Sequence, residues 1–136
     1  MAVISELIRV ESDGTISFGD YTLGAKAKTK LQQDGASYKV KTYKDITKLE
    51  CNEVFVYESV PGTAVFNFKK EASKVSFQVE GAEDAQITLE LEAESEYEIT
   101  INNETAGTMS TNLGGKLSMS VELADNAAVS IKVEKR

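Results

Sequence analysis

The chain has no histidine and no tryptophan, and its 136 residues include one cysteine and one proline. Without histidine there is no Ser-His-Asp or Cys-His pair and no imidazole ligand for a metal. A lone cysteine, Cys51, excludes thiolate zinc sites, CxxC redox chemistry and an internal disulfide. We therefore expect a protein that is not an enzyme and that holds neither a metal nor another cofactor.

The N-terminal stretch MAVISELIRVESDG lacks the basic region of a secretory signal, and Glu6 interrupts its apolar residues. No apolar run approaches the ~20 residues that span a bilayer. The unpaired Cys51 favours a reducing compartment, so we expect a cytoplasmic protein that does not insert into membranes. The net charge of −7 argues against nucleic acid as a partner.

The charge is divided unevenly along the chain. Residues 26–48 contain seven lysines and two aspartates, whereas residues 75–115 contain nine acidic residues and neither Lys nor Arg. In the basic segment Tyr38 and Tyr43 alternate with lysines, which is typical either of a surface for a polyanion or acidic glycan, or of a strand edge protected against unwanted pairing. Basic and acidic segments of one molecule can meet within the fold or between subunits.

Alternation of apolar and polar residues with period two dominates the chain. Ten segments show it, at 15–18, 25–30, 37–43, 53–60, 63–68, 74–80, 85–91, 97–102, 116–123 and 128–135. Turn residues such as Pro61-Gly62 and Gly114-Gly115 separate them, and the stretch LGGK at 113–116 is expected to be a hairpin turn. About ten short strands without helical crossovers predict an all-β fold: an antiparallel β-sandwich of the immunoglobulin or fibronectin type III kind, in one domain over residues 1–136.

The N-terminal residues allow three interpretations. Val3, Ile4, Leu7 and Ile8 have the spacing of one helical face, but they also suit an edge strand. The third alternative is an arm, within residues 1–12, that packs on a neighbouring subunit.

Five glutamates occupy every second position from Glu90 to Glu98. A single strand through all of them would be far longer than usual, so we expect two strands, 85–91 and 97–102, joined by residues 92–96. Tyr97 then follows Leu91 in the pattern of a tyrosine corner, with its hydroxyl bonded to the loop backbone. The glutamates are expected to face solvent rather than to bind a cation, because the glycine and the convergent spacing of a calcium loop are missing. Structural roles are expected for Leu91, Tyr97, Pro61, Gly62 and Gly115.

Two resemblances to known families are present. The segment YEITINNETAGTMSTNLGGKLSMSVEL, residues 97–123, resembles a C-terminal strand block of β-sandwich accessory modules appended to polysaccharide-degrading enzymes; the matching residues are Gly107, Thr111, Asn112, Gly115, Leu117, Ser120 and Val121. This resemblance implies a sandwich fold and a glycan-binding role. The stretches VISELIRVESDGTISFGDYTL and FVYESVPGTAVFNF resemble small bacterial proteins that are often labelled endosialidases. A sialidase site needs a cluster of arginines for the sugar carboxylate, however, and this chain has only Arg9 and Arg136.

The function expected first is that of a non-catalytic structural or interaction protein that self-associates into a homo-oligomer. Its candidate interaction surface consists of Lys26, Lys28, Lys30, Lys39, Lys41, Tyr38 and Tyr43, together with the N-terminal residues Val3, Ile4, Leu7 and Ile8. The second expectation is a carbohydrate-binding accessory module, whose partner would be a glycan. The third is a glycoside hydrolase that works with carboxylates alone.

Overall fold

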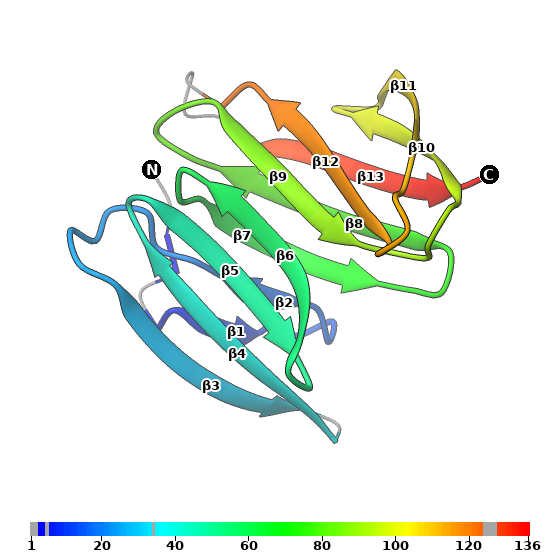
Figure 1. The fold of residues 1–136 in the computed structure, drawn as a ribbon. Helices are drawn as coiled ribbons and strands as arrows, with labels where there is room; N and C mark the ends of the chain where they lie inside the picture. The colour runs from blue at the N-terminus through cyan, green and yellow to red at the C-terminus, as the bar shows by residue number, and fades with distance from the viewer. Residues whose placement is uncertain (1–2, 5, 34, 124–127) are drawn as a thin grey trace.

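A computed structural model of the protein describes residues 3–4, 6–33, 35–123 and 128–136, and within them it contains thirteen β-strands and no helix (Figure 1). The strands are β1 (Ile8–Val10), β2 (Ile16–Phe18), β3 (Ala27–Gln33), β4 (Ala36–Tyr43), β5 (Ile46–Cys51), β6 (Val54–Val60), β7 (Ala64–Lys70), β8 (Lys74–Glu80), β9 (Ala85–Glu90), β10 (Glu96–Ile101), β11 (Glu104–Ser110), β12 (Lys116–Val121) and β13 (Val129–Lys135). The described residues form no helix that is long and apolar enough to cross a membrane.

The strands form two antiparallel sheets. Sheet A has the order β1-β2-β7-β8-β13-β10-β11, and sheet B has the order β12-β9-β6-β5-β4-β3. The prediction of an all-β antiparallel fold is therefore confirmed. All ten predicted strands are present, but the expected number was too low: β5 and β11 add to them, and β1 is an edge strand of the kind that the N-terminal residues allowed.

The strands that alternation did not mark, β5 and β11, and the short β1 have weak sequence signals for identifiable reasons. In β5 the inward positions begin with a polar residue, Thr47, so the apolar side of the alternation is incomplete. In β11 every residue is exposed, so no apolar side exists at all. Strand β1 has only three residues.

The N-terminal segment is an edge strand, not a helix. Leu7 has a positive φ of 73°, which ends any helical path, and β1 then pairs with β2. Ile4 and Ile8 are buried in this chain's own interior, with 0% and 5% of their surface exposed, while Val3 and Leu7 are half-buried. Residues 1, 2 and 5, which belong to the proposed arm, lie outside the described residues.

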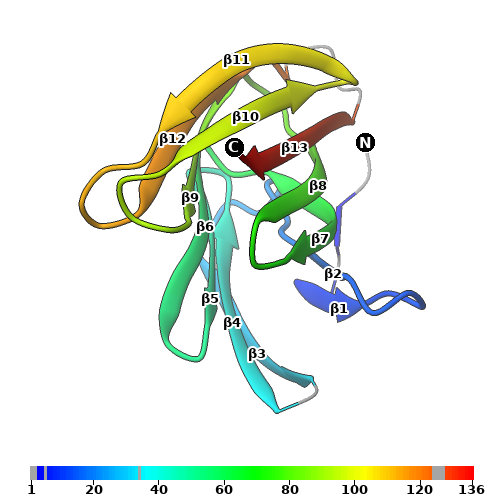
Figure 2. The ribbon, with the colours of Figure 1, turned by 90° about the vertical axis from the view of Figure 1, so that its right-hand side faces the viewer.

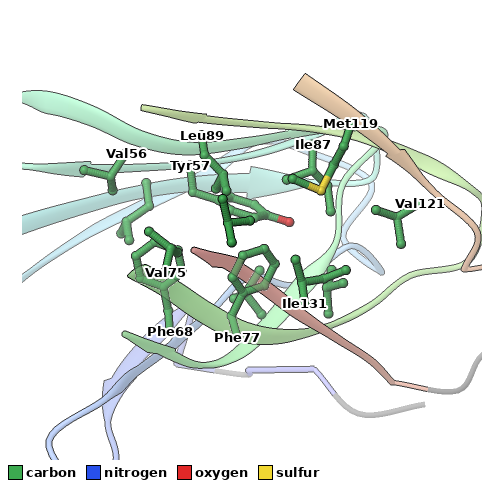
Figure 3. Close-up of a cluster of buried hydrophobic side chains, with 14 of the residues drawn as sticks. Val56, Tyr57, Phe68, Val75, Phe77, Ile87, Leu89, Met119, Val121 and Ile131 are labelled. Atoms are coloured by element: carbon green, nitrogen blue, oxygen red, sulfur yellow. The ribbon is translucent and has the colours of Figure 1, made fainter. Parts of the chain in front are cut away.

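The core lies between the two sheets and contains an aromatic cluster (Figure 3). The rings of Phe18 and Tyr57 meet edge-to-face with centroids 5.3 Å apart, and Tyr57 makes a similar contact with Phe77 at 5.6 Å. Phe68 packs against all three. Edge-to-face contacts of this kind add to the stability gained from apolar burial, so the cluster joins the sheets.

A buried hydroxyl network secures the turn around Pro61 and Gly62, where the chain passes from sheet B to sheet A. The Thr47 hydroxyl donates to the Thr63 carbonyl oxygen at 2.8 Å and accepts from the Thr63 N–H at 3.0 Å. A Cβ on Gly62 would lie 2.0 Å from the Tyr43 carbonyl oxygen, so only glycine fits there. This geometry gives Gly62 its expected structural role.

The glutamate run is divided between two strands, as predicted: β9 ends at Glu90 and β10 begins at Glu96. The backbone N–H of Glu92 donates to the hydroxyl oxygen of Tyr97 at 3.1 Å, and Tyr97 is 1% exposed. The strands belong to different sheets, so this is the corner at which the chain changes sheets.

The stretch at 113–116 is not a hairpin turn, because β11 belongs to sheet A and β12 to sheet B. The Asn112 side chain shapes the crossing: its Oδ1 accepts from the N–H groups of Gly114 at 2.9 Å and Lys116 at 3.0 Å. The Thr111 hydroxyl donates to the Glu92 carbonyl oxygen, which ties this crossing to the Tyr97 corner.

Candidate interaction surface

Five lysines gather on the outer side of sheet B, where strands β3, β4 and β5 lie next to one another. We call them the lysine face: Lys28, Lys30, Lys39, Lys41 and Lys48. The strand register sets Lys28 directly across from Lys41, and Lys41 directly across from Lys48. In the next row Lys30 lies across from Lys39. Side chains at alternate positions share a side of the sheet, so these lysines all point outward.

Like charges placed directly across a sheet destabilise it. Among the described residues, the lysine face has one ion pair, between Lys48 Nζ and Glu50 Oε2 at 3.7 Å. A shallow depression of about 110 Å³ opens between Lys28, Lys39, Lys41, Lys48 and Glu50. With four ammonium groups and one carboxylate around it, the depression is suited to an anionic group.

Two further expected residues, Lys26 and Tyr43, extend the lysine face at one end. Lys26 Nζ lies 5.9 Å from the centre of the Tyr43 ring, within the range of a cation–π contact. Tyr43 shares the parity of Lys39 and Lys41 along β4, so it belongs to the same outer side.

Tyr38 does not belong to this surface. It has the opposite parity, packs against the core and lines a cavity between the sheets. The alternation along β4 separates it from its lysine neighbours, and this signal was already present in the sequence. The N-terminal residues do not belong to the lysine face either, because Ile4 and Ile8 are buried.

The nine acidic residues of segment 75–115 do not form a single surface. Glu80 is buried, whereas Glu90 lies across from Lys116 on sheet B. Glu92 pairs with the ammonium group of Lys135. Four more glutamates lie on strands β10 and β11 and on the loop before them: Glu94, Glu96, Glu98 and Glu104. We call these four residues the acidic hairpin.

The lysine face and the acidic hairpin lie at opposite ends of the molecule. In Figures 1 and 2 strand β3 lies at the bottom and β11 at the top of the ribbon. They belong to different sheets, and no ion pair among the described residues joins the two surfaces. The two charges are therefore not neutralised by each other within one chain.

Both surfaces include the outermost strand of a sheet. Strand β3 is the last strand of sheet B, and β11 is the last strand of sheet A. Every residue of β11 is exposed, including Met109, which is 36% exposed. Such edge strands present backbone N–H and C=O groups that can pair with another strand.

The described residues contain no group of three or more acidic or cysteine side chains arranged to hold a metal ion. The pKa shifts are few and have local causes. Burial, with the nearby carboxylates of Glu80 and Asp20, raises the pKa of Tyr21 to about 12. Hydrogen bonds from Ser17 and Arg9 lower the pKa of Glu11.

Comparisons of the chain with protein-family models, with curated proteins and with solved structures find no match in any of the three. We therefore infer the function from the geometry and charge of the surfaces described above.

Proposed function

We propose that the protein is a non-catalytic interaction protein that self-associates, with the lysine face of one copy docked on the acidic hairpin of the next. The observation that carries this proposal is the separation of the two charged surfaces at opposite ends of one molecule. The facing lysines repel one another, and a carboxylate that enters the depression among them relieves that repulsion. A second copy supplies such carboxylates at the acidic hairpin.

This contact joins two different surfaces, so it is heterologous and produces a ring or an open chain of subunits. The edge strands β3 and β11 lie at the contact, where pairing of their free backbone groups adds hydrogen bonds to the charge attraction. Salt weakens the contact, because exposed charges are screened within about 3 Å at 1 M ionic strength. We infer a cytoplasmic location for this assembly, supported by the single, unpaired Cys51.

The first test is light scattering after size exclusion at ~50 mM and ~1 M salt. The proposal requires a particle larger than one chain at low salt that dissociates at high salt. A monomer under both conditions contradicts it.

Charge reversal supplies a sharper test. The double variant Lys28→Glu with Lys39→Glu makes the lysine face acidic, and the double variant Glu96→Lys with Glu98→Lys makes the acidic hairpin basic. Each variant alone should be monomeric at low salt, whereas an equimolar mixture should assemble again, because each reversed surface then meets its complement. The matched control, Lys44→Glu with Lys116→Glu, has the same charge change outside the lysine face and should leave assembly intact.

The second candidate function is an acidic-glycan-binding module, favoured by the position of Tyr43 on the same outer side as the lysines. In that case the lysine-face variant loses retention on an immobilised uronate- or sulfate-bearing glycan, the acidic-hairpin variant retains it, and the protein is monomeric at both salt concentrations. This pattern distinguishes the two functions with the same set of proteins.

A further inference from the structure

An open cavity of about 420 Å³ lies between the two sheets, at the end of the sandwich that contains the β5–β6 turn. Sheet A contributes the turn from Asp13 to Ile16 and the end of β7, and sheet B contributes residues of β4, β5 and β6. This volume falls within the usual range of small-molecule sites. The cavity is on the inner sides of the sheets, so it is separate from the lysine face on the outside.

The cavity has an apolar floor and walls. Phe68 and Val56, which are 6% and 7% exposed, reach it from opposite sheets and belong to the hydrophobic core (Figure 3). Tyr38 and Cys51 are half-buried along the wall, and Val54 is 51% exposed at the rim. Apolar surface that remains open to water in a concave site favours the binding of an apolar group.

Irregularities in both sheets shape the cavity. In β7 a bulge between Phe66 and Lys69 gives Asn67 a positive φ of 57° and turns Phe68 inward. The bulge is fixed by two hydrogen bonds, from Asn67 N–H to Ser17 Oγ at 3.1 Å and from Asn67 Nδ2 to Thr15 Oγ1 at 3.0 Å. Bulges occur preferentially next to binding sites, where they redirect a side chain.

Hydrogen bonds and a bulge also hold the opposite wall of the cavity, which belongs to sheet B. A second bulge interrupts the β5–β6 pairing, between Leu49 and Glu50. The tight turn at Asn52 and Glu53, both with positive φ, is tied to β4, because Asn52 N–H donates to the Ser37 carbonyl oxygen at 2.7 Å and Ser37 N–H donates to Asn52 Oδ1 at 2.9 Å. The cavity is thus formed before any ligand binds, which lowers the entropy lost on binding.

One ammonium group at the mouth of the cavity, that of Lys70, is available to an anion. Lys69 and Lys70 both line the cavity; Lys69 Nζ lies 3.7 Å from Glu71, and no ion pair is formed by Lys70 among the described residues. Among the residues that the structure describes, the one lining carboxylate is that of Asp13, which accepts from the Thr15 N–H at 3.0 Å and the Thr15 hydroxyl at 2.6 Å, and these bonds lower its pKa. Lys69 is therefore balanced by Glu71, and Lys70 is the ammonium group at the mouth that forms no ion pair within the described part of the chain.

From these observations we propose that the cavity binds a small amphipathic anion, with its apolar part between Phe68 and Val56 and its carboxylate at Lys70. A medium-chain fatty acid has this chemistry. The site is independent of the proposed self-association, and a monomeric protein retains it.

The test uses Cys51, the one thiol of the chain, as a reporter on the cavity wall. The rate of alkylation by iodoacetamide is measured by intact mass with increasing decanoate, and with decyltrimethylammonium as the cationic counterpart. Decanoate should slow alkylation in a saturable way, by roughly tenfold at roughly ten times its dissociation constant. The cationic amphiphile should not protect Cys51 at the same concentration.

Two variants locate the site. Lys70→Glu should weaken the apparent affinity for decanoate by about fivefold, and Lys132→Glu, which makes the same charge change on the outer side of β13, should leave it unchanged. Val54→Glu places a carboxylate at the rim on an already exposed side chain, so the protein should fold and lose protection by decanoate. Absence of saturable protection, equal protection by the cation, or an equal effect of Lys132→Glu would each overturn the proposal.

Discussion

Gly115 and Leu91 lie in direct backbone contact between the two sheet crossings. The Leu91 N–H donates to the Gly115 carbonyl oxygen at 2.7 Å, and a Cβ on Gly115 would lie 2.3 Å from the carbonyl oxygen of Leu91. Gly115 also has a φ of +79°. The contact joins the β9–β10 corner to the β11–β12 crossing, and it leaves no room for a side chain at residue 115.

Gly115→Ala should therefore lower the free energy of unfolding by about 3 kcal/mol or more, because the backbone is strained and two backbone segments must separate. Gly14→Ala is the matched control: Gly14 has a φ of +86°, but a Cβ there would meet no atom within 4 Å. Gly14→Ala should lower the free energy of unfolding by about 1 kcal/mol, from backbone strain alone. Urea unfolding of both variants measures the difference, and equal costs would show that the contact with Leu91 is unimportant.

Tyr97→Phe removes the oxygen that accepts the Glu92 N–H. Since Tyr97 is 1% exposed, the loss should destabilise the protein by about 1–2 kcal/mol, with the urea m-value unchanged. Tyr43→Phe, at a half-buried position on the lysine face, should stay within about 0.5 kcal/mol of the unmodified protein. If the two substitutions cost the same, the corner hydrogen bond contributes nothing to stability.

Thr47→Val keeps the shape of the side chain but removes the hydroxyl that bonds to both backbone groups of Thr63. Thr47 is fully buried, so Thr63 is left with unpaired polar groups away from water, and the expected cost is about 2–3 kcal/mol. Thr88→Val serves as the control, because the Thr88 and Ser118 hydroxyls meet at an exposed position on the outer side of sheet B. Its effect should be about 0.5 kcal/mol or less in thermal or urea unfolding.

Tyr21 should make stability depend on pH in alkaline solution. Its pKa in the folded protein is raised to about 12, above the value of about 10 in the unfolded chain, so its stabilising contribution is complete below about pH 10 and is lost as the pH rises toward 12. Between these values the free energy of unfolding should fall more steeply than in Tyr21→Phe, by about 1.4 kcal/mol per pH unit.

Urea unfolding at a series of alkaline pH values measures this difference, and the tyrosinate absorbance gives the pKa directly. Parallel stability curves for the two proteins would show that Tyr21 ionises as readily in the folded state as in the unfolded one.

The sequence predicted most of the fold because alternation marks each strand that has one buried side. The Tyr97 corner was predicted for the same reason: the split of the glutamate run leaves Leu91 and Tyr97 on the apolar side. Alternation did not mark strand β11, because every residue of it is exposed, and the crossing at Asn112 was predicted to be a hairpin turn. The choice between a hairpin and a crossing depends on the backbone of Leu91 and Glu92, which is distant in sequence.

Four lysines of the lysine face, Lys28, Lys30, Lys39 and Lys41, were expected on an interaction surface from the sequence, but Lys48 and the alignment of the lysines were not. Lys28, Lys41 and Lys48 meet in one row only because two successive hairpins fix the register. The cavity had no sequence signal, since it depends on a bulge at Asn67 and on hydrogen bonds from Asn67 to Thr15 and Ser17.

Strand β13 pairs with β8 on one side and with β10 on the other, so it occupies an interior position in sheet A although it follows all other strands in the sequence. During synthesis on the ribosome, the β10–β11 hairpin therefore has no strand on the inner side of β10 until residues 129–135 emerge. Sheet B has no such dependence, because its last strand, β12, adds to an edge. We expect sheet B to form first and sheet A to close around a strand that arrives late.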